Sequence, residues 1–174
     1  METATSALDA IDPGELRPFA ERYLDAWNSR EPSAVGACVA EDVLWEDPAL
    51  PEPLHGRAQV ESFVTLTATG FPDYEFTELA PPAIAEDGLT AYAPWRVTGT
   101  NTGPLDPPGF AATEKRIEIE GIDRWQFRDG LISRYRAFYD FAEMGRQLGL
   151  MPPRGGAIER LGVRAQRLGA RVRR

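Results

Sequence analysis

The first regular pattern along the chain is helical. Apolar side chains recur every three or four residues from Leu16 to Trp27, which is the spacing of one buried helix face. Asp12 followed by Pro13 is typical of a helix N-terminus, where the carboxylate accepts from unpaired backbone N–H groups. The pattern therefore predicts a first helix that begins at Pro13. Two further helices are predicted over residues 33–39 and 57–68.

After these helices the pattern changes to alternation of apolar and polar residues, which is typical of strands with one buried face. Turn residues interrupt it, most clearly at Asp129 and Gly130. The predicted strands cover residues 43–47, 74–80, 89–100, 114–127 and 131–139, and a last helix covers 141–148. Because the predicted helices come first and the predicted antiparallel strands follow, the order of elements predicts an α+β fold and not an alternating α/β fold.

Length and composition fit one globular domain. The chain has 174 residues, of which 43% are hydrophobic and 26% charged, so neither a disordered nor a membrane class is indicated. No apolar run approaches the roughly 20 residues that a membrane-spanning helix needs. Cys38 is the single cysteine and lies in an apolar context, which predicts a buried, inert thiol. Without an export signal, we expect the protein in the cytoplasm.

Charged residues are distributed unevenly along the chain. Residues 151–174 contain seven arginines and one glutamate, so this tail carries +6. Because the whole chain carries −8, residues 1–150 carry −14, which argues against nucleic-acid binding through the main domain. We therefore expect one domain over residues 1–150 and a basic tail with a weak helical pattern over 151–174. The tail is either solvated or a contact for nucleic acid, an anionic surface or the acidic body of a neighbouring subunit.

Three polar side chains fall on faces that should be buried. Asp123 shares its strand face with Trp125, and Asp47 shares its face with Trp45. A buried carboxylate disfavours its charged form, so its pKa should rise unless it is paired. Tyr23 lies on the apolar stripe of the first helix. Each also has a structural interpretation, because Asp before proline can form a turn, a helical Tyr can pack in the core and a strand Asp can pair with Arg.

The segments that carry these residues resemble ketosteroid isomerases, within the nuclear-transport-factor-2-like superfamily. The resemblance rests on Glu21–Asn28, Trp45–Pro48, Glu52–Gly56 and Ile122–Phe127. It implies a cone-shaped, curved, mostly antiparallel sheet wrapped over the N-terminal helices (cystatin-like). It also implies that Asp47 is a base and that Tyr23 and a neutral Asp123 donate hydrogen bonds to an enolate oxygen, a role that ketosteroid isomerase is known to give to an aspartic acid. A homodimer through the sheet face is implied as well.

Over residues 15–150 the chain also resembles the SnoaL-like polyketide cyclase family. The matching motifs are Phe71–Asp73, Thr98–Gly103, Phe127–Gly130, Tyr139–Asp140 and Leu148–Leu150. This resemblance implies that Asp140 is the general acid/base of an intramolecular aldol closure. Asp140 is also placed to cap the last helix, so both roles stay open. The limonene epoxide hydrolase type is disfavoured, because Arg96-Val97-Thr98 lacks the first acid of its Arg-x-Asp motif.

These observations lead to one hypothesis and one alternative. The hypothesis is a cofactor-independent enzyme, an isomerase or an aldol cyclase, that acts through an enolate on a hydrophobic polyketide- or steroid-like carbonyl compound. Its expected catalytic residues are Tyr23, Asp47, Asp123 and Asp140, and its expected substrate-binding residues are Trp45, Trp95, Trp125 and Phe63. No metal site is expected, since His55 is the only histidine. The alternative is a non-catalytic ligand-binding or assembly module of the same fold.

Overall fold

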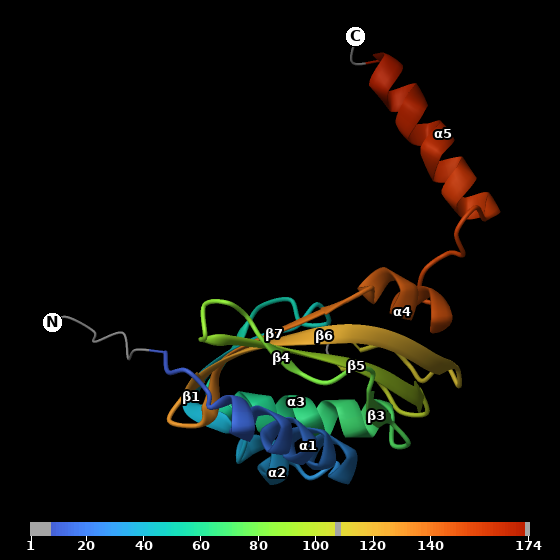
Figure 1. Cartoon of the computed structure of the whole chain (residues 1–174). Coiled ribbons are helices and arrows are strands. Elements are labelled where there is room, and N and C mark those ends of the chain that lie inside the picture. The colour runs from blue at the N-terminus through green and yellow to red at the C-terminus, as the bar shows by residue number, and fades with distance from the viewer. Residues whose placement is uncertain (1–7, 107–108, 173–174) are drawn as a thin grey trace, which may run out of the picture.

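Three helices at the start of the chain lie against one face of a curved sheet (Figure 1). The computed structural model describes residues 8–106 and 109–172. The elements are α1 (Pro13–Ser29), α2 (Pro32–Gly36), β1 (Val39–Glu46), β2 (Leu54–His55), α3 (Arg57–Gly70), β3 (Glu75–Glu78), β4 (Ala83–Ile84), β5 (Thr90–Thr100), β6 (Arg116–Arg128), β7 (Leu131–Tyr139), α4 (Phe141–Gln147) and α5 (Ala157–Val172). No helix among the described residues is long and apolar enough to cross a membrane.

The sheet has seven strands in the order β2-β1-β7-β6-β5-β3, with β4 paired to β5. Every pairing is antiparallel except that of β1 with β7, which is parallel. The β6–β7 hairpin turns at Asp129 and Gly130, which both have positive φ (52° and 72°), as a two-residue turn between twisted strands requires. The expected α+β fold with a curved, mostly antiparallel sheet is confirmed.

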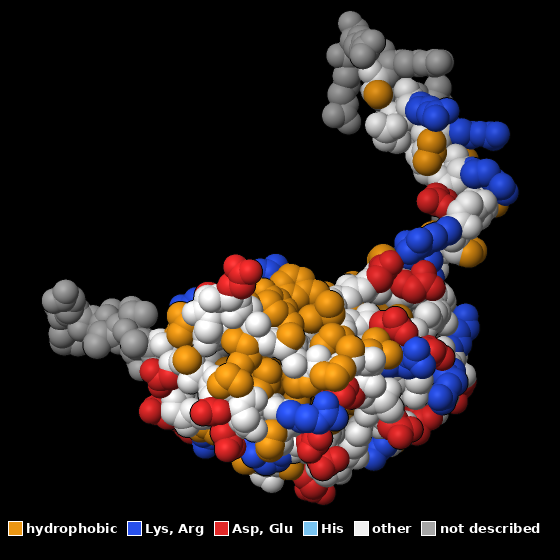
Figure 2. All heavy atoms as spheres, viewed as in Figure 1, with side chains coloured by type: hydrophobic (Ala, Val, Ile, Leu, Met, Phe, Trp, Pro, Cys, Tyr) orange, Lys and Arg blue, Asp and Glu red, His pale blue; other side chains and the backbone are white. Residues whose placement is uncertain are grey.

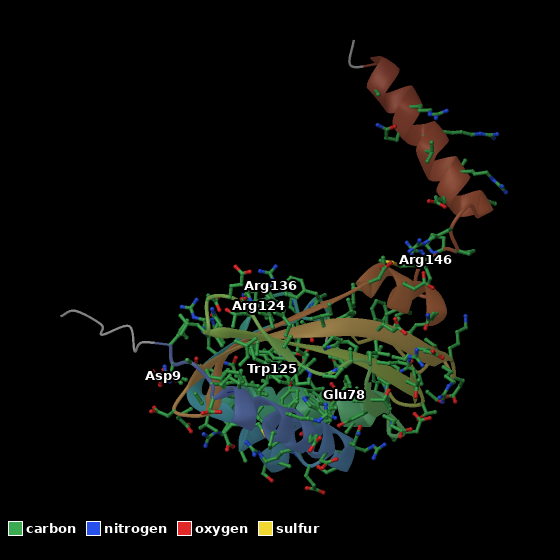
Figure 3. The ribbon with its side chains drawn as sticks, viewed as in Figure 1. Asp9, Glu78, Arg124, Trp125, Arg136 and Arg146 are labelled. Atoms are coloured by element: carbon green, nitrogen blue, oxygen red, sulfur yellow. The ribbon has the colours of Figure 1, made fainter. Side chains whose placement is uncertain are left out.

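Strand β6 shows most clearly how the sequence pattern sets the two faces of the sheet. Its burial alternates without interruption from Arg116, which is exposed, through Ile117, which is buried, to Phe127. Figure 3 shows the result at two neighbouring positions: Trp125 points into the space between sheet and helices, whereas Arg124 points away from it. The predicted inner face of β6, including Asp123, is therefore confirmed as buried.

Helix α1 packs its predicted apolar stripe on this inner face. Asp12 caps the helix by accepting from the Gly14 N–H at 2.7 Å, as the sequence predicts. Phe19 and Tyr23 approach the ring of Trp125 edge-on, with centroids 5.6 and 5.0 Å away. Burial of each such side chain stabilises the fold by roughly 1.5–3 kcal/mol. The contacts therefore hold α1 firmly against the inner face of β6.

Two adjoining predicted boundaries are wrong by three or more residues. The second helix ends at Gly36, not at residue 39, and the strand predicted to begin at Val43 already begins at Val39. The reason is long-range pairing, because Val39 lies opposite Ile132 of β7 and the Ile132 N–H donates to the Cys38 carbonyl at 3.0 Å. This tertiary contact overrides the local helical pattern. Cys38 itself is buried, as predicted.

The C-terminal end leaves the body of the molecule. Helix α4 follows β7 directly, and a segment rich in Pro and Gly, residues 152–156, then leads into α5. Figure 1 shows α5 extending away from the sheet and the other helices. The weak helical pattern of the tail thus corresponds to a helix of 16 residues.

Candidate active site

An apolar cavity of about 230 Å³ lies between the inner face of the sheet, α3 and α4. Its wall is largely aromatic and aliphatic, and its acidic members are Asp47, Asp106 and Asp123. Asp106 belongs to an exposed loop, whereas Asp47 and Asp123 come from the inner side of the sheet. A hollow with apolar walls and few polar groups suits a hydrophobic ligand held in one orientation.

Asp123 is the more deeply buried of the two sheet acids, with 3% of its surface exposed. The indole Nε1–H of Trp95 donates to its Oδ1 at 2.6 Å, and the Tyr135 hydroxyl donates to the same oxygen at 2.7 Å. Burial raises the pKa of Asp123 to about 7; these two hydrogen bonds lower it, and the charge of Asp47 raises it. Because both donors converge on Oδ1, a proton on the other oxygen would make Asp123 a hydrogen-bond donor.

Gly121 is the reason that Trp95 can reach Asp123. Trp95 lies opposite Gly121 in the β5–β6 pairing, and its indole ring crosses β6 at that position. A Cβ atom at residue 121 would lie 2.5 Å from Trp95 Cζ2 and 2.9 Å from the Phe138 carbonyl oxygen. Only glycine leaves this space, so the residue that interrupts the inner face of β6 sets the position of a donor to Asp123.

Asp47 directly follows β1 and is half-buried. Its Oδ1 accepts from the Ala49 N–H and from the Tyr139 hydroxyl, both at 2.8 Å. Burial raises the pKa of Asp47, while these two hydrogen bonds lower it by favouring the carboxylate. Asp47 is therefore accessible from the cavity, and its environment still disfavours the charged carboxylate. Such a carboxylate is a stronger base than one in water.

The two tyrosines that bond these acids come from the same face of β7. Tyr135 and Tyr139 both line the cavity, and burial raises the pKa of each phenol above its usual range. Tyr135 also stacks on Trp45, with ring centroids 3.5 Å apart and planes at 11°. Within the described residues, neither Asp47 nor Asp123 forms an ion pair. Each acid is thus bonded by neutral donors, and its pKa is set mainly by burial.

Comparison with known proteins supplies the family. The SnoaL-like domain profile matches residues 20–135. The chain belongs to the SnoaL-like domain family. A curated relative, the steroid Delta-isomerase of Nocardioides simplex, is 33% identical over 131 residues, which cover 75% of this chain and 94% of that protein.

Solved structures agree on the fold of this SnoaL-like chain. TsrD from Streptomyces laurentii superposes with a TM-score of 0.68 at 23% identity, covering 81% of this chain and 99% of that one. A SnoaL-like polyketide cyclase candidate from Jannaschia sp. CCS1 gives 0.69 at 15% identity, with coverages of 83% and 99%. At these identities the likeness concerns the fold. The membership expected from sequence motifs is confirmed.

Two of the predicted catalytic residues of the SnoaL-like chain do not line the cavity. Tyr23 is buried and its hydroxyl has no hydrogen-bond partner among the described residues. It faces a separate hollow of about 10 Å³, whose wall also includes Asp123. Asp140 is exposed, caps α4 by accepting from the Glu143 N–H at 2.8 Å, and pairs with Arg154 at 2.9 Å. The Glu143 N–H bond and the nearby Arg154 hold the pKa of Asp140 below its ordinary value, as befits a surface cap.

The predicted substrate-binding residues divide in the same way. Trp95 and Phe63 line the cavity, whereas Trp45 and Trp125 are fully buried behind it. Trp45 supports Tyr135 by stacking, and Trp125 packs against α1. The structure thus brings Asp47, Asp123, Trp95 and Phe63 together around one cavity and places the other predicted residues behind it or on the surface.

Sequence reasoning missed Tyr135 and Tyr139. Both lie on the buried face of β7 together with Ala137, at the alternating spacing that identifies a strand face. Arg134 and Arg136, which flank Tyr135, lie on the opposite, exposed face. Alternation alone could have placed the two phenols inside, but their pairing with particular acids depends on the β1–β7 and β6–β7 registers.

Proposed function

We propose that this chain is a cofactor-independent enzyme that moves a proton on a hydrophobic, carbonyl-bearing substrate of polyketide or steroid type through an enolate. The observation that carries the proposal is the pair of acids, Asp47 and Asp123, with raised pKa values in the wall of one apolar cavity. Catalytic sites place acids in different surroundings so that one works as a base and another as a donor.

In the proposed reaction Asp47 begins as a carboxylate. It removes a proton from the carbon next to the substrate carbonyl, and the C–H electron pair forms a C=C bond while the carbonyl oxygen becomes an enolate oxygen. Neutral Asp123 donates a hydrogen bond to that oxygen. A donor of this kind typically lowers the barrier by roughly 3–4 kcal/mol. Tyr139 and Tyr135 are positioning residues that hold the two acids through the bonds described above.

The enolate can continue in two ways. In an isomerase, Asp47 returns its proton to a different carbon, and the double bond moves into conjugation with the carbonyl. In an aldol cyclase, the enolate carbon forms a bond to a second carbonyl carbon of the same substrate, and the new alkoxide takes the proton from Asp47. Both routes balance without an added co-reactant. The steroid Delta-isomerase relative favours testing the isomerase route first.

The non-catalytic alternative makes a different electrostatic prediction. A purely structural pair of acids would be held by cations, with both pKa values depressed. In the described residues both pKa values are raised and neither acid has a cationic partner, which supports the catalytic proposal.

The experiment is turnover of a β,γ-unsaturated 3-ketosteroid, followed by the ultraviolet absorbance of the conjugated product. In parallel, uptake of deuterium from D₂O next to the carbonyl detects enolate formation in ketones that do not isomerise. Asp47→Asn should abolish both signals with an unchanged circular dichroism spectrum. Asp140→Asn is the matched control and should keep them. Undiminished turnover or exchange in Asp47→Asn would remove Asp47 from the mechanism.

We also propose a homodimer formed through the outer sheet face. Tyr92, Ile122 and Phe138 are exposed there on the three neighbouring strands β5, β6 and β7, with Ile122 directly opposite Phe138. Figure 2 shows hydrophobic side chains gathered over the sheet. An apolar patch of this kind on a sheet commonly marks an interface. Light scattering should show a dimer that Ile122→Glu converts to a monomer, and a monomeric parent protein would contradict the proposal.

A further inference from the structure

Helix α5 carries a row of arginines that have no acidic partner among the described residues. Arg160, Arg164 and Arg167 are exposed and follow one side of the helix at four- and three-residue spacing. Leu161 is 66% exposed. In the described part of the chain none of these three arginines has an acidic partner. Figure 2 shows the blue arginine side chains along the extended helix.

Such a helix is poorly stabilised by itself. An isolated helix of 16 residues is marginal in water, and like charges three or four residues apart repel one another. Glu159 is the only acid between Ala157 and Val172, and it bonds the Gly155 N–H at the helix start instead of an arginine. The arginine row therefore has no anion within the helix to oppose it, and Leu161 and Ala165 place exposed apolar side chains beside it, at the four-residue spacing of one helix face.

Three occupants of this helix surface are disfavoured. The acids of the body nearest the tail, Asp140 and Glu143, are already paired with Arg154 and Arg146. A second copy of α5 would add a second arginine row, and its one acid, Glu159, already bonds the Gly155 N–H. Nucleic acid would satisfy the arginines but offers no apolar surface for the exposed Leu161. An anionic lipid surface supplies both negative headgroups and an apolar layer.

The mouth of the cavity adds a second apolar surface next to the tail. Leu66, Phe110, Phe141 and Leu150 line the cavity, yet each is between 38% and 45% exposed. Phe141 begins α4, and Leu150 lies seven residues before Ala157, where α5 begins. The short chain segment between Leu150 and Ala157 keeps α5 close enough to the cavity mouth for both to contact the same surface.

We propose that α5 and this apolar rim dock the protein on an anionic lipid bilayer. The helix lies on the bilayer with its arginines toward the headgroups and Leu161 toward the apolar layer. The mouth of the cavity then faces the lipid phase, where a hydrophobic compound is concentrated. The docking rests on the charge and exposure of α5 and not on the proposed reaction, so either can fail without the other.

The test is flotation of the full-length protein with vesicles of phosphatidylcholine alone or of phosphatidylcholine mixed with phosphatidylglycerol, whose anionic headgroups create a negative surface potential. Binding is expected only with phosphatidylglycerol and should weaken as salt increases. Arg160→Gln, Arg164→Gln and Arg167→Gln together should lower the affinity on the order of a hundredfold, as about 1 kcal/mol per arginine implies. Leu161→Gln should lower it roughly tenfold at unchanged charge.

A matched variant separates local from total charge. Arg22→Gln, Arg116→Gln and Arg134→Gln remove three exposed arginines from the body and should leave vesicle binding unchanged. Equal loss in both triple variants would overturn the proposal, as would absence of binding to phosphatidylglycerol vesicles or equal binding to neutral ones. If the protein instead binds a DNA duplex, and Leu161→Gln does not change that binding, the helix belongs to a nucleic-acid interface. If the protein self-associates and the α5 triple variant does not, the helix belongs to an interface between copies of the chain.

Discussion

The titration of Asp123 offers a direct physical test of the site, because it should be visible in the stability of the protein. The substitution Asp123→Asn replaces the acid with a side chain of the same shape that is always neutral. Its carbonyl oxygen can accept from Trp95 and Tyr135 as Asp123 Oδ1 does, so the hydrogen bonds of the neutral acid are preserved. What the substitution removes is the ability to ionise.

The expected effect follows from the difference between the folded and unfolded pKa values. The pKa of Asp123 rises from its ordinary 3.8 to about 7 on folding. Between these values the folded state binds more protons than the unfolded state, so stability falls as pH rises through that window and is constant above it. At 1.36 kcal/mol per pKa unit, the parent protein should lose about 4 kcal/mol that Asp123→Asn does not lose. Stability of a domain is commonly about 5–15 kcal/mol, so the loss is measurable.

The assay is urea unfolding followed by tryptophan fluorescence at several pH values from 4 to 8.5. The free energy of unfolding of Asp123→Asn relative to the parent should rise from near zero at pH 4 to its full value above pH 7. Asp140→Asn is the control of opposite sign, because the pKa of Asp140 is lowered on folding. A difference between Asp123→Asn and parent that does not change with pH would refute the argument that burial governs this acid.

Three further substitutions test the supporting contacts. Tyr139→Phe removes a hydrogen bond that favours the Asp47 carboxylate, so the acidic limb of the pH–rate profile should move upward by up to about one pH unit. Gly121→Ala should destabilise the protein by about 1–3 kcal/mol in urea unfolding and displace Trp95, which indole fluorescence should report. Asp140→Ala should lower the melting temperature by about 2–4 °C in calorimetry while turnover stays at the parent level, whereas lost turnover would return Asp140 to the mechanism.

The fold was largely predictable because its longest strand, β6, alternates strictly between buried and more exposed residues. The inner face of β6 can be listed from the sequence, including the acid at position 123, since period two leaves only two possible faces. The α1 boundary was predictable for a local reason too, as Asp12 and Pro13 determine the first turn. The wrong end of α2 shows the limit, because the residues near Val39 are drawn into β1 by a strand that lies far along the chain.

The site was predictable only in part. Asp47 and Asp123 were found because charge on a buried face is anomalous in any sequence. Which phenol meets which acid depends on register, and Tyr23 and Tyr135 both have the burial expected of a donor. The space above Gly121 that admits Trp95 is a property of two packed strands. No local pattern contains that information.

The parallel pairing of β1 with β7, called the seam here, has a consequence for how the protein would lose function. Strand β1 is connected to the rest of the sheet through β7, and their register is interrupted between Val39 and Leu44. Asp47 follows one strand of this seam and Tyr139 ends the other. If β1 separates from β7 in a partial opening event, Asp47, the proposed base, loses its hydrogen bond from Tyr139 while β5 and β6 stay paired. Inactivation would then precede melting, and amide hydrogens of β1 would exchange with solvent before those of β6.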